Sequence, residues 1–184
     1  MDFIGFPKLS RLVRECVVTE KIDGTNAQVY ITPEGDMFVG SRTRWITPED
    51  DNAGFARWCS ENKDELLKLG VGSHFGEWWG KGIQRTYGLR ERRFSLFNVS
   101  RWSEDNTPSC CSVVPILYNG IFNTTNINRC LTDLRDSGSV ASEGFMRPEG
   151  ICVYHVAANK VFKQTLEGDG HKGIKIDQRG TKVT

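Results

Sequence analysis

Long apolar runs are absent from the sequence. No run approaches the roughly 18 apolar residues that a membrane-spanning helix needs. The first residues, 1–7, also lack the basic start and long apolar core of a secretory signal. We therefore expect a soluble, cytoplasmic protein that is not exported.

Paired cysteine motifs are also absent. The six cysteines are scattered through the chain, and none forms a Cys-x-x-Cys pair. Reduced thiols are therefore expected rather than a disulfide framework. A zinc site that uses Cys110 and Cys111 with His74 or His155 is disfavoured, because adjacent cysteines are poorly spaced for a structural zinc ion.

The sequence also lacks a strong net charge, because its formal net charge is only +1. The charges are nevertheless segregated along the chain. Acidic residues gather between positions 49 and 65, whereas Glu91 is the only acid among six basic residues between positions 81 and 101. That basic stretch fits either a surface that binds phosphates or a solvated loop. The candidates for contact with nucleic acid are Arg90, Arg92 and Arg93.

The 184 residues contain no repeat, low-complexity tract or linker, which predicts one domain over residues 1–184. Apolar periodicity and turn residues predict helices over 52–69 and 127–135. They predict strands over 16–22, 27–31, 37–41, 73–79, 94–99, 113–118, 151–156 and 160–165. Most links between strands are too short for parallel crossovers, so the expected class is α+β with antiparallel sheets flanked by helices.

Lys21 ends the first expected strand and is followed by Asp23 and Gly24, which favour a turn. This arrangement would expose the lysine to a ligand. Lys-x-Asp-Gly alone is a weak signal, because many strands end in such a turn.

An ordered set of segments accompanies Lys21. They are 20–26 (Glu-Lys-Ile-Asp-Gly-Thr-Asn), 40–44 (Gly-Ser-Arg-Thr-Arg), 75–80 (Phe-Gly-Glu-Trp-Trp-Gly), 94–99 (Phe-Ser-Leu-Phe-Asn-Val), 149–154 (Glu-Gly-Ile-Cys-Val-Tyr) and 160–163 (Lys-Val-Phe-Lys). In this order they resemble the motifs of the covalent nucleotidyltransferase superfamily, which contains ATP-dependent ligases and mRNA capping enzymes. The segments 20–26, 41–43 and 75–77 are most similar to the RNA ligase branch, whose members repair RNA and seal nicks.

The resemblance implies an ATP-grasp-like nucleotidyltransferase domain. Because the last motif ends near residue 165, we expect no C-terminal OB or other appended domain. The resemblance further implies an ATP-dependent polynucleotide ligase, most specifically an RNA ligase. Lys21 would attack the α-phosphorus of ATP to form lysyl-AMP. AMP would pass to a 5′-phosphate end, which a 3′-hydroxyl would then seal. An amine attacks only without its proton, and bound Mg²⁺ or Mn²⁺ would favour that form.

The resemblance also implies roles for individual residues. Lys21 would be the catalytic nucleophile, and Glu149 would help to hold the divalent metal. Glu20 would accept from the adenine amino group, Phe97 would stack on adenine, Glu77 would hold the ribose hydroxyls, Arg42 would bind phosphate or ribose, and Lys163 would neutralise the phosphates. The remaining members of the expected nucleotide site are Ile22, Asn26 and Lys160.

Three features depart from the family pattern. Related chains space the last two lysines as Lys-x-Lys, whereas Lys160 and Lys163 are three apart and should face opposite ways on a regular strand. Asn98 stands where many ligases have an acid. Many relatives carry a C-terminal domain, so this chain is expected to act as a minimal ligase or with a partner protein that supplies the missing part.

Other functions remain open at this level. A DNA ligase uses the same chemistry, and a capping guanylyltransferase uses GTP in place of ATP. A non-catalytic nucleic-acid binding module would keep the fold without needing Lys21, Glu77, Glu149 and Lys163 together. The expected partner in each case is nucleic acid, and for a ligase it is RNA or a nicked duplex that contains RNA.

Overall fold

Two β-sheets of different size build the protein. The computed structural model describes residues 2–167, 175–176 and 182–183. Its strands are β1 (Glu15–Lys21), β2 (Thr25–Ile31), β3 (Met37–Gly40), β4 (Trp45–Ile46), β5 (Gly72–Gly80), β6 (Arg92–Leu96), β7 (Cys111–Val113), β8 (Ile116–Ile121), β9 (Gly150–His155), β10 (Lys160–Thr165), β11 (Lys175–Ile176) and β12 (Lys182–Val183). Its helices are α1 (Phe55–Glu61), α2 (Lys63–Leu67) and α3 (Thr124–Ser137).

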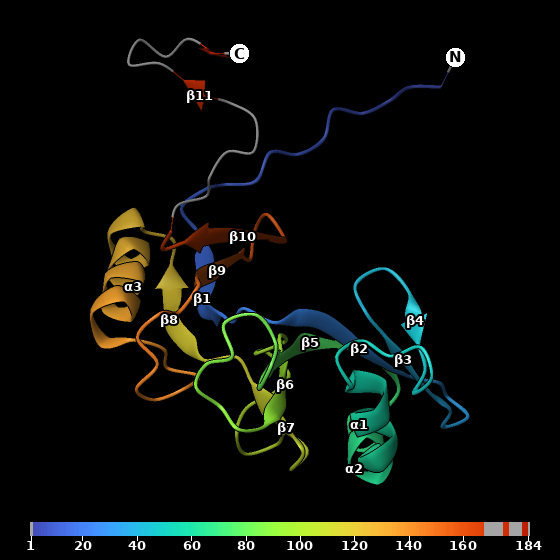
Figure 1. The fold of residues 1–184 in the computed structure, drawn as a ribbon. Coiled ribbons are helices and arrows are strands. Elements are labelled where there is room, and N and C mark those ends of the chain that lie inside the picture. The colour runs from blue at the N-terminus through green and yellow to red at the C-terminus, as the bar shows by residue number, and fades with distance from the viewer. Residues whose placement is uncertain (1, 168–174, 177–181, 184) are drawn as a thin grey trace.

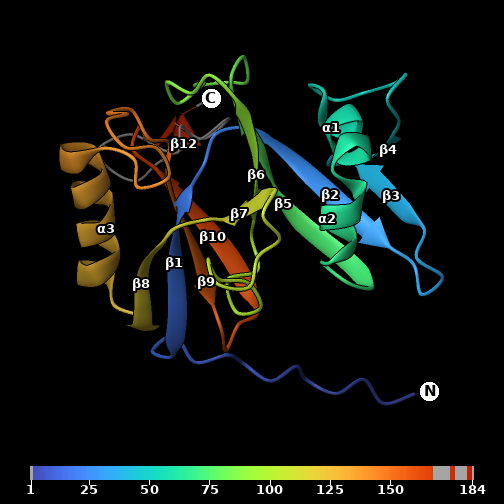
Figure 2. The ribbon, with the colours of Figure 1, turned by 90° about the horizontal axis from the view of Figure 1, so that it is seen from below.

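The smaller of the two main sheets has the strand order β10-β9-β1-β8, and all of its pairs are antiparallel. Side chains along β1 alternate between a buried and a partly exposed face. The buried face packs against α3, which runs along the outside of this sheet (Figure 2). The core between them consists of Cys16, Val18, Ile127, Cys130, Leu134, Ile151 and Val153.

The larger sheet has the order β4-β3-β2-β5-β6-β7, and α1 and α2 cover one of its faces. Aromatic rings fill much of that core: Phe55 of α1 lies 5.3 Å from Trp78 of β5 and 5.0 Å from Phe94 of β6, between ring centroids. The opposite face of β2–β5 carries no helix in the part of the chain that the structure describes (Figure 1).

Residues 22–24 connect the two sheets, because β1 of the smaller sheet runs directly into β2 of the larger one (Figure 1). Ile22 is buried here in a small core with Trp79, Tyr87 and Val114. Gly24 passes so close to β5 that a Cβ atom on it would lie 2.4 Å from the carbonyl oxygen of Trp78. Only glycine allows this approach, and the link between the sheets therefore requires it.

Most expected elements are confirmed within a few residues, but the helix expected over 52–69 is two shorter helices. They meet at Asn62, whose backbone leaves the helical region at φ −112° and ψ 21°. The side chain of Asn62 donates to the carbonyl oxygen of Trp58 at 2.8 Å, and so does its backbone NH at 3.1 Å. A polar side chain that competes for backbone groups in this way ends the first helix.

The single strand expected over 113–118 is wrong, because the chain changes sheets there. Residues 111–113 form β7 in the larger sheet and residues 116–121 form β8 in the smaller one. Pro115 lies between them and cannot donate to a strand ladder, although its carbonyl oxygen accepts from Glu20 NH at 2.9 Å. β7 also pairs with β6 in parallel, so the expectation of antiparallel sheets fails at that edge.

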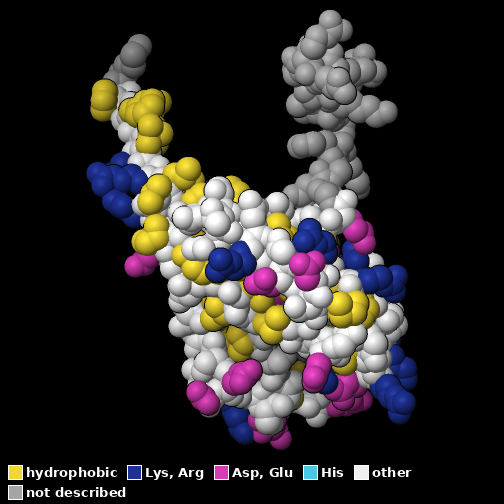
Figure 3. Space-filling view, turned by 90° about the vertical axis from the view of Figure 1, so that its left-hand side faces the viewer, with side chains coloured by type: hydrophobic (Ala, Val, Ile, Leu, Met, Phe, Trp, Pro, Cys, Tyr) yellow, Lys and Arg dark blue, Asp and Glu magenta, His cyan; other side chains and the backbone are white. Residues whose placement is uncertain are grey.

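Residues 2–13 form an arm without helix or strand that extends from the body (Figures 1 and 3). Its apolar side chains are exposed, including Phe3 and Phe6. The base of the arm is fixed where Leu12 O bonds to the ring of His155 at 2.6 Å.

Two expectations from composition can be compared with the fold. Each of the six cysteines is a free thiol, as expected. Within the described ranges, no helix combines the length and the apolar character needed to cross a membrane.

Candidate active site

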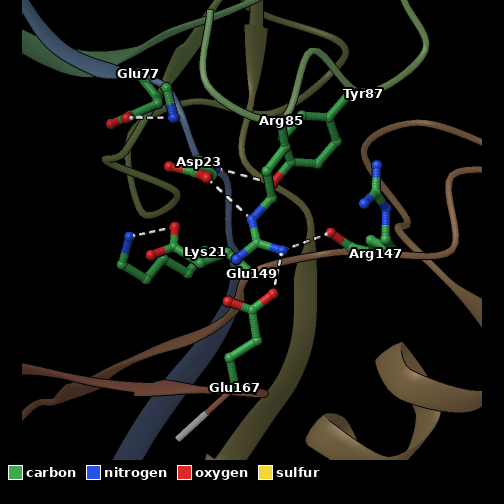
Figure 4. Close-up of polar contacts among 9 residues, drawn as sticks. Lys21, Asp23, Glu77, Arg85, Tyr87, Arg147, Glu149 and Glu167 are labelled. Atoms are coloured by element: carbon green, nitrogen blue, oxygen red, sulfur yellow. Dashed lines mark hydrogen bonds and ion pairs between the residues drawn. The ribbon is translucent and has the colours of Figure 1, made fainter. Parts of the chain in front are cut away.

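Lys21 lies where the two sheets meet and forms an ion pair with Glu149 (Figure 4). Its Nζ atom donates to Oε2 of Glu149 at 2.5 Å, and the two side chains are only 23% and 17% exposed. The strand register explains the contact, because Lys21 lies directly opposite Gly150, the residue after Glu149. Two residues 128 positions apart in the sequence are therefore adjacent in the fold.

Gly150 fixes the position of Glu149 at the start of β9. Its φ angle is +155°, and a Cβ atom on it would lie 2.2 Å from the carbonyl oxygen of Gln164 in β10. A side chain at position 150 would push β10 away from β9. Glycine therefore allows Glu149 to reach Lys21 while β10 stays paired.

Glu77 lies on β5 on the other side of the junction, and its carboxylate holds the start of β2. One oxygen accepts from Gly24 NH at 3.0 Å and the other accepts from Nδ2 of Asn26 at 3.2 Å. The side chain is 8% exposed, and burial raises the pKa of Glu77 to about 7, although the positive charge of Lys21 opposes this shift. Asn26 and Glu77 are direct partners across the β2–β5 ladder.

Asp23 turns away from Lys21 and is held by two residues of the 81–90 loop. Its carboxylate accepts from Nε of Arg85 at 2.9 Å, and its backbone NH donates to the hydroxyl of Tyr87 at 2.8 Å. Arg85 also donates to the carbonyl oxygen of Arg147 at 3.2 Å and to Glu167 at 3.0 Å (Figure 4). One guanidinium thus joins the Lys21 turn, the segment before Glu149 and the chain after β10.

Glu20 and Ile22 flank Lys21 but point to the opposite, buried side. The carboxylate of Glu20 is 1% exposed and accepts from Ser139 Oγ at 2.6 Å and from the NH groups of Val140 and Ala141 at 2.8 and 2.9 Å. Its oxygens are engaged in holding the loop after α3. The Glu20 carboxylate is therefore not available to adenine, and the expected contact of Glu20 and Ile22 with a nucleotide stays a prediction for their backbone groups.

Lys163 and Lys160 lie on opposite faces of β10, as their spacing predicts. Lys163 is opposite Cys152, and Cys152 is opposite Thr19. Thr19 lies two residues before Lys21, so Lys163 and Lys21 share one face of the sheet. Lys160 is opposite His155, whose partner Cys16 belongs to the face that α3 covers. The expectation that Lys160 belongs to the nucleotide site therefore conflicts with the register.

Cys152 marks how closely the charged groups gather. Its thiol is largely buried, and burial raises the pKa of Cys152. The charges of Lys21 and Lys163 oppose that shift, and those of Glu149 and Glu77 add to it. The charges of four expected site residues, contributed by both sheets, therefore act on this thiol.

Phe97 and Arg42 lie on the larger sheet. Phe97 is 41% exposed and directly follows the last residue of β6. Its NH donates to Phe75 O at 2.9 Å, so Phe97 lies beside Phe75 of β5. Arg42 is exposed in the β3–β4 loop and has no hydrogen bond or ion pair among the described residues. That loop lies at the end of β3 where Gly40 pairs with Gln28, two residues from Asn26.

Two of the three arginines expected to contact nucleic acid are engaged inside the protein. Arg92 donates to the carbonyl oxygens of Lys81 and Ala53 at 3.0 and 2.8 Å, and Arg93 pairs with Glu91 at 2.7 Å. Arg90 is exposed and has no such partner in the described part of the chain. Arg92 and Arg93 thus have partners within the protein but remain partly or fully exposed, and the contact of all three arginines with nucleic acid stays a prediction.

The residues around Lys21 fit a divalent metal through oxygen ligands. Carboxylates are the side chains that Mg²⁺ and Mn²⁺ prefer, and Mg²⁺ is usually held by one or two of them together with substrate phosphates. Glu149 is partly exposed at the mouth of the site and suits that role. Among the described residues no cluster of three or more His, Cys, Asp or Glu side chains is placed to hold a metal.

Sequence reasoning missed Arg85 and Tyr87. Arg85 belongs to the basic stretch and was grouped with the residues available to phosphate. Tyr87 is 1% exposed in a loop without sequence periodicity, at a φ angle of +51°. No local pattern predicts that these two side chains reach Asp23, because the contact spans more than 60 residues.

Comparison with known proteins bears on the family and the fold of the chain. The RNA ligase family model matches residues 14–165, and no curated protein matches. Among solved structures, a mutant Naegleria gruberi RNA ligase with ATP and Mn is similar at 23% identity and a TM-score of 0.61, over 82% of this chain and 49% of the ligase. A second mutant of that ligase, with AMP and Mn, is 20% identical with a TM-score of 0.60, over 84% of this chain and 50% of the ligase. The ligase with PPi is 24% identical with a TM-score of 0.61, over 82% of this chain and 49% of the ligase.

This chain thus spans about half the length of those ligases. The structural likeness supports a ligase-type nucleotidyltransferase fold, made mostly of β-sheet with few helices. The family match contains every residue from Lys21 to Lys163 discussed above. The chain belongs to the RNA ligase family.

Proposed function

We propose that this protein is an ATP-dependent RNA ligase that carries AMP on Lys21. The observation that carries the proposal is the ion pair between Lys21 and Glu149 at the junction of the two sheets, with Glu77 buried at the same junction opposite Asn26. The carboxylate by itself favours the protonated amine, so a divalent cation bound to Glu149 would release Lys21 for nucleophilic attack on a phosphorus atom. A purely structural ion pair would not need Glu77 to remain buried beside it.

The reaction would proceed in three transfers. Nζ of Lys21, after losing a proton, bonds to the α-phosphorus of ATP as the bond to the β-phosphate oxygen breaks and pyrophosphate leaves. An oxygen of the RNA 5′-phosphate then takes the AMP from Lys21, which regains its amine. Finally a 3′-hydroxyl attacks the 5′-phosphorus, loses its proton and releases AMP as the strand is sealed.

The surrounding side chains would position the nucleotide. Glu77 faces the site from β5 and would accept from ribose hydroxyls, while Phe97 offers an exposed ring for the adenine. Arg42 and Lys163 would balance the negative charge of the phosphates. A divalent metal held by Glu149 would stabilise charge on the α-phosphate.

Covalent labelling tests the proposal directly. We expect the purified protein with Mg²⁺ and α-labelled ATP to acquire a covalent label that alkali leaves in place and acid removes, as a phosphoramidate requires, and Lys21→Ala to acquire none. Lys160→Ala serves as the matched control and should label like the wild type, because that lysine lies on the other face of β10. Preferential labelling by GTP would indicate a capping enzyme, and no label from well-folded protein would indicate a binding module.

The choice of nucleic acid needs a second assay. Nicked duplexes with RNA or DNA on each side of the nick should be compared with single-stranded ends. We expect sealing to require RNA, consistent with the family. Equal sealing of all-DNA nicks would show instead a DNA ligase, and sealing only after addition of a second protein would support the partner expected for a minimal ligase.

A further inference from the structure

Exposed aromatic side chains gather on the face of the larger sheet that α1 and α2 do not cover. Tyr30 of β2, Phe38 of β3 and Trp45 of β4 lie within 6.4 Å of one another, between ring centroids. Phe38 and Trp45 are 50% and 55% exposed, and Phe75 of β5 is 54% exposed. Tyr30, Phe38, Trp45 and Phe75 are called the aromatic strip below.

The register puts all four rings on one face. Tyr30 is opposite Phe38, Gly40 is opposite both Gln28 and Trp45, and Gln28 is opposite Phe75. Residues 26, 28 and 30 of β2 share this face, which also carries Glu77 opposite Asn26. The aromatic strip is therefore continuous with the side of the sheet that faces the Lys21 site.

The local packing shows how one ring lies over the sheet. Position 40 is glycine, and a Cβ atom there would lie 3.2 Å from the ring of Trp45. The absence of a side chain at Gly40 lets the Trp45 ring lie over the strand. The rings of Tyr30, Phe38 and Trp45 form a contiguous aromatic surface in which they are tilted by 33° to 56° against one another.

The strip has dimensions that suit a few nucleotides. From Phe75 across the sheet to Trp45 is about 14 Å, and along β2 the row of Tyr30 and Phe38 lies about 7 Å beyond the row of Phe75 and Trp45. Every base has a π-face, so exposed rings on a sheet stack bases without demanding a sequence. A strand leaving the Lys21 site would meet Phe75 first and the other three rings next.

The charges near the strip also favour a nucleic acid at the end close to the site. Arg42, which has no polar partner in the described residues, lies in the loop between the strands of Phe38 and Trp45. Asp50 is paired with Arg44 at 2.5 Å. The unpaired acids Glu34 and Asp36 lie in the β2–β3 turn, at the far end beyond Tyr30, and would limit the track to that length.

We propose that the aromatic strip binds unpaired nucleotides of the RNA strand that enters the Lys21 site. This inference rests on the proposed function and specifies its substrate as RNA with a single-stranded segment next to the reacting end. Stacking on Trp45 and Phe38 holds the bases while Arg42 contacts a phosphate. The adenine of ATP uses Phe97 and is not part of the strip.

Binding without catalysis tests the proposal. In a Lys21→Ala background and without ATP, a fluorescent single-stranded RNA of roughly a dozen nucleotides should bind, as measured by anisotropy at low salt. Trp45→Ala and Phe38→Ala should each weaken binding by about 5-fold to about 100-fold. Trp45→Phe should restore most of the affinity, because it keeps a stacking ring.

Phe162→Ala is the matched control. Phe162 is 56% exposed on β10 of the other sheet and lies outside the strip, so its variant should bind RNA like the parent. Each substitution, placed in the chain with Lys21 intact, should still label with ATP, which shows that the variant is folded.

Several outcomes would overturn the proposal. Equal affinities for the Trp45, Phe38 and Phe162 variants would remove the strip from RNA binding, as would tight binding of a fully paired nicked duplex but not of single strands. A dimer that Trp45→Ala converts to a monomer would make a second copy the occupant. Failure of ATP labelling in the parent chain would reject the lysyl-AMP proposal but would leave the RNA affinities as an independent result.

Discussion

Glu77 is an acidic residue in a buried environment that disfavours its charged form. Its pKa is raised to about 7 by burial, and its hydrogen bonds with Gly24 and Asn26 keep the carboxylate in place across the β2–β5 ladder. A carboxylate held in this way beside Lys21 is costly for the apo protein. It becomes useful if ribose hydroxyls replace water as its partners.

We expect this cost to appear as a pH dependence of stability. Because the folded pKa of about 7 lies above the ordinary value of 4.5, the folded state binds more protons between these limits, and stability falls as pH rises through that window. The difference amounts to roughly 3 kcal/mol. Urea unfolding from pH 4 to 8 should show this loss in the wild type and not in Glu77→Gln.

Glu77→Gln is a suitable comparison because glutamine has a similar shape and can still accept from Gly24 NH. The relevant quantity is the difference in unfolding free energy between the two proteins, since other carboxyl groups titrate in both. A difference that is constant with pH would show that the carboxylate titrates normally in the folded protein.

At the residue scale, the sequence predicts the site well where a motif and strand alternation agree. Lys21, Glu149 and Lys163 are found together, and the spacing of Lys160 from Lys163 predicts their opposite faces. The same alternation turns the Glu20 carboxylate into the core, so the expected contact of Glu20 with adenine stays a prediction for its backbone. The partners of the carboxylate at residues 139–141 are about 120 positions away, and no sequence pattern indicates them.

At the scale of elements, the loop over 81–90 acts as a brace for the Lys21 turn. The single side chain of Arg85 contacts the Lys21 turn at Asp23, the segment before Glu149 and the residue Glu167. Tyr87 adds a bond to the same turn from the small core between the sheets. The loop has no regular structure, so its function as a brace follows from tertiary contacts and was not predictable from periodicity.

Replacing Arg85 should therefore disturb both stability and the first chemical step. We expect Arg85→Met to lower the unfolding free energy by about 1–3 kcal/mol, mainly through the lost bond to the partly buried Asp23. It should also slow lysyl-AMP formation at saturating ATP, because the turn that orients Lys21 loses its brace. Thermal unfolding and the rate of ATP labelling measure the two effects.

Arg90→Met is the matched control, because it removes an arginine of the same loop that has no polar partner in the described chain. Arg85→Lys should recover little, since an ammonium group lacks the planar fork that reaches Asp23 and Arg147 O together. An Arg85→Met protein with normal stability and normal labelling would show that the brace is dispensable.

Element boundaries were predictable only where local sequence dominates. The N-terminus of α3 is capped by the side chain of Asn123, which accepts from Thr125 NH at 2.8 Å, and this helix is close to its expected range. The boundaries of the strands around Pro115 were not predictable, because a short apolar run carries no information about which sheet it joins. The parallel pairing of β6 with β7 likewise depends on how the loop over 97–110 returns.

On the scale of the whole molecule, the proposed nucleotide site is shared by two sheets whose main cores are separate. Lys21, Glu149 and Lys163 belong to the smaller sheet or its edge, and Glu77 and Phe97 belong to the larger one. The covalent links at this junction include residues 22–24, and the core there is small. A nucleotide that contacts both sheets would therefore add non-covalent contacts between them.

ATP binding should accordingly raise the unfolding temperature through contacts on both sheets. An ATP analogue with a methylene group between the α- and β-phosphorus atoms would bind without transferring AMP. At 100 times its dissociation constant it should stabilise the protein by about 2.7 kcal/mol, a shift of roughly 5–10 °C for a chain of this size. Phe97→Ala on one sheet and Lys163→Ala on the other should each reduce the shift, whereas Lys160→Ala should keep it. Loss of the shift in the Lys160 variant but not in the Lys163 variant would show that the ligand reaches the opposite face of β10, and the shared site inferred from the strand register would then be wrong.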